Sequence, residues 1–138
     1  MNEALARAVD AVVEERPGAF HAAFASVAAL VPHYQLDTVA DRIVDDIPAT
    51  IPWEVAADLL GMLMWTTMDN GASIVRAAEQ WLNAAVDLRR VQIALSLDVY
   101  PFKNNQAMQH VLANVARRFP DLAQQCDRCV AERAQSGA

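Results

Sequence analysis

The sequence predicts an all-α protein of seven or eight helices, and three observations carry that prediction. Apolar residues recur at helical spacing almost throughout the 138-residue chain, and they alternate with period two over no long stretch. Alanine, the best helix former, occurs 27 times against four glycines. Hydrophobic residues make up 54% of the chain, enough apolar surface for a folded core. We therefore expect a single all-helical domain over residues 1–138.

The predicted helices are separated by prolines and turn residues. Helices end before Pro17 and Pro48, because the residue that precedes a proline is pushed out of the helical region. Pro52 begins a long helix that ends near the turn Asp69-Asn70-Gly71, and Asp87 is a good N-cap for a later helix. The apolar stripes cover residues 5–16, 17–31, 36–47, 52–69, 74–85, 87–95, 108–119 and 120–130.

One face of each helix is expected to lie in a common core. The residues that fall on these faces at spacings of three and four are apolar and mostly large. The predicted core contains Phe20, Phe24, Ile43, Leu59, Leu63, Ile74, Trp81, Val91, Val111, Val115 and Phe119.

Helix starts recur at a nearly constant interval. Expected starts at Pro17, Pro52, Asp87 and Pro120 are separated by 35, 35 and 33 residues, which is the period of a helix-hairpin repeat. Two architectures fit this spacing. One is a stack of helix hairpins, HEAT-like or α-solenoid-like, and the other is an irregular helical bundle.

The sequence predicts no metal site, cofactor or catalytic centre. Cys126 and Cys129 have the spacing of half a zinc site, but both fall on an apolar stripe, and no second ligand pair follows. We expect both thiols to be reduced, buried and metal-free. His21, His33 and His110 are each isolated from other ligands and from any nucleophile motif. A binding protein is therefore expected rather than an enzyme.

Membrane and nucleic-acid partners are not expected either. The start of the chain lacks the basic region of a secretory signal, which favours a cytoplasmic location, and the longest uncharged stretch is interrupted by prolines and histidines. The pairs Arg89-Arg90 and Arg117-Arg118 are too sparse for a nucleic-acid interface in a protein of pI about 4.9. The expected partner is therefore a protein.

The charge distribution is the most informative feature. Residues 37–69 contain seven acidic residues against Arg42 alone, while the remainder has ten acidic and ten basic residues. The whole net charge of −6 therefore lies within one predicted helix hairpin. Charge that served solubility alone would be spread more evenly.

Helical spacing places these carboxylates in rows. Residues 37, 41 and 45 are four apart, and a second row on the predicted 52–69 helix includes Gly61 and the aromatic Trp65. Such a surface suits a basic partner with Trp65 as an apolar anchor, although an ordinary solvated acidic face is the alternative. The predicted partner-binding residues are Asp37, Asp41, Asp45, Glu54, Asp58, Trp65 and Asp69.

The chain resembles the small, acidic, all-helical immunity proteins with which bacteria neutralise their own polymorphic toxins of the contact-dependent or type VI kind. The resemblance covers the whole chain in size and helix organisation, together with the stretch from Trp65 to Gly71 and the later pair Trp81-Leu82. It implies a stoichiometric inhibitor of a basic toxin domain, frequently a nuclease. Two alternatives stay open: an α-solenoid adaptor that binds a peptide or protein, and an enzyme that gathers His33 or His110 with distant carboxylates.

Overall fold

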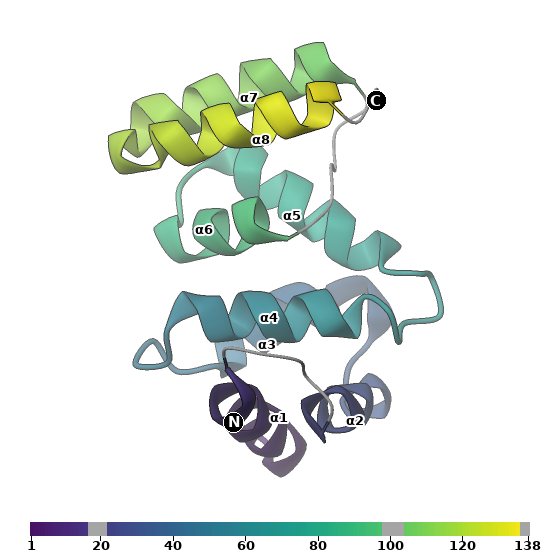
Figure 1. The fold of residues 1–138 in the computed structure, drawn as a ribbon. Coiled ribbons are helices and arrows are strands. Elements are labelled where there is room, and N and C mark those ends of the chain that lie inside the picture. The colour runs from purple at the N-terminus through teal and green to yellow at the C-terminus, as the bar shows by residue number, and fades with distance from the viewer. Residues whose placement is uncertain (17–21, 98–103, 136–138) are drawn as a thin grey trace. The chain divides into compact units, whose positions relative to one another are not determined.

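The computed structural model describes residues 1–16, 22–97 and 104–135, and it confirms the all-α prediction (Figure 1). Over these residues the chain forms eight α-helices and no strand. They are α1 (Glu3–Glu15), α2 (Ala22–Ala28), α3 (Val39–Asp46), α4 (Trp53–Leu63), α5 (Ala72–Ala84), α6 (Leu88–Ser96), α7 (Asn105–Arg118) and α8 (Ala123–Gln135). Three short 3-10 helices join them: η1 (Val31–His33), η2 (Leu36–Thr38) and η3 (Pro120–Leu122).

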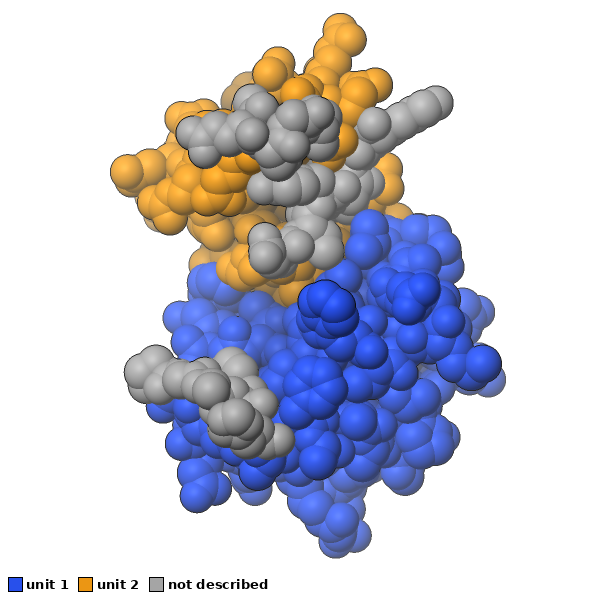
Figure 2. Space-filling view, turned by 45° about the vertical axis from the view of Figure 1, so that its right-hand side comes forward, with its two compact units in different colours: residues 1–77 blue, residues 78–138 orange. Residues whose placement is uncertain are grey.

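The chain divides into two compact units, with the boundary inside α5 (Figure 2). Unit 1 is Met1–Ala77 and unit 2 is Ala78–Ala138. Each unit has its own set of packed helices. The single-domain organisation of residues 1–138 stays a prediction, as does the choice between stacked hairpins and an irregular bundle.

Unit 1 is built on α1, α2 and α4, which pack against one another (Figure 1). Each helix contributes side chains, mostly three or four positions apart, that are almost completely buried. The fully buried members from these helices are Leu5, Ala8, Val12, Ala23, Val27, Ala56, Leu59, Leu60 and Leu63.

Unit 2 is built on α7 and α8, which lie alongside each other, with α6 packed against α8 (Figure 1). Their buried side chains include Leu112 and Val115 on α7 and Cys126 on α8. The Trp81 ring is 7% exposed and lies 5.6 Å from the Arg90 guanidinium, a cation–π contact.

Where the structure describes them, the predicted helix starts lie at or next to the observed ones. Asp87 caps α6, since its side chain accepts a hydrogen bond from the Arg90 backbone N–H at 3.2 Å. Starts expected at Pro52 and Pro120 are matched by α4, which begins at Trp53, and by η3, which begins at Pro120. The start expected at Pro17 lies outside the described residues.

Burial is confirmed for seven of the predicted core residues, Ile43, Leu59, Leu63, Ile74, Trp81, Val91 and Val115. They divide between units 1 and 2, so the single common core stays a prediction. Phe24 was wrongly included, because its side chain is 37% exposed. The buried face of α2 runs through Ala23 and Val27, and Phe24 lies one residue, about 100°, away from Ala23. Val111 and Phe119 are only half-buried, and Phe20 lies outside the described residues.

The predicted 52–69 helix was too long: α4 ends at Leu63, and residues 64–71 form a succession of turns. Side-chain hydroxyls compete for the helical hydrogen bonds there, since the Thr66 Oγ1 donates to the Leu63 carbonyl at 2.9 Å. Gly71 completes the turn with a φ of +83°, a conformation that favours glycine. This early end of α4 changes the arrangement of the candidate site.

Candidate functional site

Asp37, Asp41 and Asp45 form what we call the acidic face. Asp41 and Asp45 lie in α3, whereas Asp37 lies in the preceding 3-10 helix η2, and Thr38, the N-cap of α3, has a non-helical φ of −121° and ψ of 6°. The spacing of four therefore places Asp41 and Asp45 along one side of α3, and the position of Asp37 in the same row stays a prediction. Asp37 and Asp45 are exposed and Asp41 is half-buried, so the face is accessible from solvent.

Asp58 forms an ion pair that sequence analysis did not predict, because its partner is distant in the sequence. Its carboxylate forms an ion pair of 2.5 Å with the guanidinium of Arg16, which follows α1, 42 residues earlier. Partial burial raises the pKa of Asp58; Arg16 opposes that rise and Glu54 adds to it. Asp58 thus joins α1 to α4, and its contact with a partner stays a prediction, as does that of the exposed Glu54.

Trp65 and Met68 are exposed apolar residues of the same turn segment, and together we call them the apolar turn. Their exposed fractions are 84% and 93%, and both lie in the turns between α4 and α5. The expected row through Glu54, Asp58 and Trp65 on one helix face is wrong, because Trp65 lies beyond the end of α4. Large apolar side chains this exposed are unusual in a folded protein and typically mark a binding surface when they gather.

Asp69 has a structural role in this turn. Its Oδ2 accepts a hydrogen bond from the Ser73 backbone N–H at 2.8 Å, and its Oδ1 accepts one from the Gly71 N–H at 3.1 Å. Burial acts to raise the pKa of Asp69, but hydrogen bonds from Ser73, Thr67 and Gly71 outweigh it and lower the pKa. The carboxylate therefore caps the first turn of α5, and its contact with a partner stays a prediction.

A cavity of about 210 Å³ opens in unit 1 next to the apolar turn. Sequence reasoning missed it because its walls come from two segments about thirty residues apart. The only sequence signal was a methionine directly before the turn Asp69-Asn70-Gly71. The lining residues are Val31, Tyr34, Leu36, Val39, Leu63, Thr67 and Met68.

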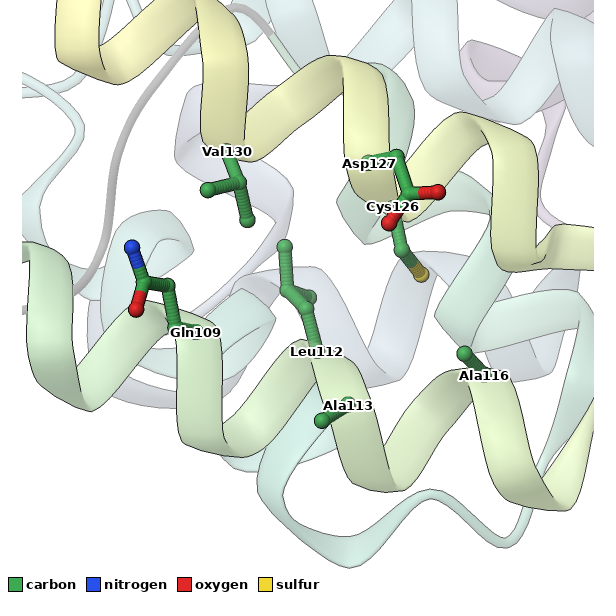
Figure 3. A pocket seen from close by; sticks show the side chains of 7 residues that line it. All are labelled: Gln109, Leu112, Ala113, Ala116, Cys126, Asp127 and Val130. Carbon is green, nitrogen blue, oxygen red and sulfur yellow. The ribbon is translucent and has the colours of Figure 1, made fainter.

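A second cavity, of about 230 Å³, lies between α7 and α8 in unit 2 (Figure 3). Leu112 rises from α7 between Cys126 and Val130 of α8, and Gln109 and Asp127 are the polar side chains at its walls. Burial raises the pKa of the Cys126 thiol to about 11, which keeps it protonated and unreactive at neutral pH. These features describe a packing groove without a reactive group.

Both cysteines are free; Cys126 is buried as predicted, whereas Cys129 is only half-buried. The Cys129 Sγ faces the Leu95 carbonyl oxygen at 3.8 Å. Among the residues that the structure describes, no cluster of three His, Cys, Asp or Glu side chains is arranged to hold a metal ion. His33 and His110 are exposed, and His21 lies outside the described residues.

The two units differ sharply in charge. Unit 1 contains eleven acidic and four basic residues, a net charge of −7, and unit 2 contains six acidic and seven basic residues, a net charge of +1. The acidic face, the apolar turn and the cavity beside it all belong to unit 1. The candidate site is therefore a negatively charged surface with an apolar element, and it holds no assembled catalytic group.

Comparison with protein-family models, with curated proteins and with solved structures finds no match to this chain. None of the helices in the described part of the chain has the length and apolar character needed to cross a membrane.

Proposed function

We propose that this chain is an immunity-type inhibitor that binds a basic toxin domain stoichiometrically through unit 1. The observation that carries the proposal is the charge imbalance: unit 1 holds −7 and unit 2 holds +1. The resemblance in sequence character to bacterial immunity proteins supports the same function. Inhibition of this kind needs a complementary surface and no turnover chemistry.

The acidic face and the apolar turn have different physical roles in this proposal. Exposed carboxylates attract a basic protein over a distance of about 10 Å at 0.1 M salt and so raise the association rate. Trp65, which is 84% exposed in the free protein, is the type of side chain that dominates binding energy once a partner covers it. We therefore expect the carboxylates to control association and Trp65 to control dissociation.

The test measures binding kinetics against the toxin domain encoded by the adjacent gene, together with protection of cells that express that domain. The triple variant Asp37→Asn, Asp41→Asn, Asp45→Asn removes three charges from the acidic face. Its matched control, Asp121→Asn, Asp127→Asn, Glu132→Gln, removes three exposed charges from unit 2. We expect association to slow by about tenfold or more at low salt in the first variant only.

Three results would contradict the proposal. The adjacent gene product is not bound, co-expression gives no protection, or the two triple variants slow association equally. The last result would mean that total charge matters and the location of the acidic face does not. Asp58 and Asp69 are left unchanged in both variants because they hold the fold of unit 1 together.

A further inference from the structure

The cavity beside the apolar turn has the size and chemistry of a pocket for one apolar side chain. Its volume of about 210 Å³ exceeds the roughly 150 Å³ of a dry protein cavity that accepts benzene. A leucine, methionine or phenylalanine side chain therefore fits. Its apolar lining residues are Val31, Leu36, Val39, Leu63 and Met68.

The polar side chains that line this cavity already have partners within unit 1. The Tyr34 hydroxyl donates to Asp46 Oδ2 at 3.1 Å and accepts from Asn2 Nδ2 at 3.1 Å. The Thr67 Oγ1 accepts from the Gly71 backbone N–H at 2.8 Å. With these groups satisfied, a polar occupant gains little in return for its desolvation, so the cavity selects an apolar one.

This cavity belongs to unit 1, which has a net charge of −7, and both Asp46 and Arg42 lie close enough to the lining residue Tyr34 to act on its pKa. The Asp46 carboxylate is hydrogen-bonded to the hydroxyl of the lining residue Tyr34, and Asp37 directly follows the lining residue Leu36. Both aspartates are exposed. A partner segment that inserts an apolar side chain therefore meets the net negative charge of unit 1, which favours arginine or lysine next to that side chain.

The backbone that carries Met68 is held in place before binding. The turn is fixed by the bond from Gly71 to Thr67 and by the two bonds that Asp69 accepts, while the Met68 side chain is 93% exposed. A turn whose backbone is already ordered loses less backbone entropy on binding. The cavity edge is thus exposed and preorganised.

We infer that this cavity receives one apolar side chain of a basic segment in the protein partner. The inference rests on the proposed function and adds the chemistry of the partner: a large apolar residue flanked by arginine or lysine. The acidic face attracts that segment, and the cavity holds its central side chain.

The test uses the full chain and three short peptides, followed by backbone-amide NMR. The probe GRRLRRG carries both elements, GRRARRG lacks the large apolar side chain, and GQQLQQG lacks the charges. We expect the first peptide to shift the amides of Leu36, Val39, Leu63 and Met68. The alanine peptide should bind about ten- to a hundredfold more weakly, since it buries less apolar surface, and the glutamine peptide should bind more weakly and without salt dependence.

Two variants make the test specific. Leu36→Trp fills the cavity from a residue that is 37% exposed, and Met68→Ala removes its exposed wall; both should weaken GRRLRRG binding several-fold or more. The matched control is Val86→Ala, which shortens an exposed apolar side chain in unit 2 and should leave binding unchanged. Met68→Ala removes almost no buried surface, so its folding is secure.

The inference is overturned if the leucine and alanine peptides bind equally, or if the shifted amides lie elsewhere. It is also overturned if binding does not approach saturation at about 5 mM peptide, a concentration that largely saturates a site with a Kd of about 1 mM. Its failure is distinguishable from failure of the proposed function. Peptide binding without protection against the toxin domain would leave the cavity as a binding site and reject the immunity role. Protection without peptide selectivity would support the immunity role and reject the cavity as the binding site.

Discussion

Replacing Asp69 by alanine should destabilise unit 1 by removing the cap of α5. The carboxylate accepts hydrogen bonds from the backbone N–H groups of Ser73 and Gly71 at 2.8 and 3.1 Å. In Asp69→Ala both donors lose this acceptor. Loss of a side-chain cap of this kind costs about 1–2 kcal/mol, which corresponds to a fall in melting temperature of about 3–8 °C for a protein of this size.

The pH dependence of this contribution follows from the lowered pKa of Asp69. The folded pKa lies below the unfolded value of about 3.9, so the ionised carboxylate stabilises the fold fully above the unfolded pKa. As the pH falls through the folded pKa, the carboxylate is protonated and that contribution is lost. The difference in stability between the wild type and Asp69→Asn should therefore be present at pH 7 and vanish in acid.

The assay is urea denaturation followed by circular dichroism, at pH 7 and at a series of acidic pH values down to about pH 2. Asp69→Asn is the matched variant, because its single side-chain oxygen still accepts one of the two hydrogen bonds while the charge and the second acceptor are removed, and it should retain part of the stability that alanine loses. Asp121→Ala removes an exposed carboxylate that caps no helix, and it should change the unfolding free energy by less than about 0.5 kcal/mol. Equal stability of Asp69→Ala and the wild type would refute the capping role.

Three further predictions concern a buried leucine, the ion pair between Arg16 and Asp58, and the Cys126 thiol. Leu59→Ala truncates a fully buried side chain and should cost about 2–5 kcal/mol in a denaturation experiment, whereas Val13→Ala, at a side chain 50% exposed, should cost less than about 1 kcal/mol. The Asp58 carboxyl should titrate above the ordinary aspartate pKa by NMR, and Arg16→Ala should raise that pKa further because the opposing cation is gone; an unchanged value would reject the ion pair. The Cys126 thiol, with a pKa of about 11, should react with a thiol reagent at pH 8 at least about tenfold more slowly than in the urea-unfolded chain, and equal rates measured by mass spectrometry would contradict its burial.

The sequence by itself determined the fold class and most helix starts, because these depend on interactions between residues three or four positions apart. Asp87 caps its own helix, and Pro52 directly precedes α4, so both signals are complete within one turn. The concentration of acidic residues between positions 37 and 69 was equally visible, since charge is counted without knowledge of the fold.

The tertiary structure decided where α4 ends and how the site is arranged. The periodic pattern continued to residue 69, but the turns after Leu63 move Trp65 off the helix, where it is exposed together with Met68. The ion pair between Arg16 and Asp58 joins residues 42 apart, and the cavity combines residues 31–39 with residues 63–68. Side-chain periodicity describes one helix at a time, whereas exposure, pairing and cavities arise from which helices pack together, and that is fixed only when the whole unit has folded.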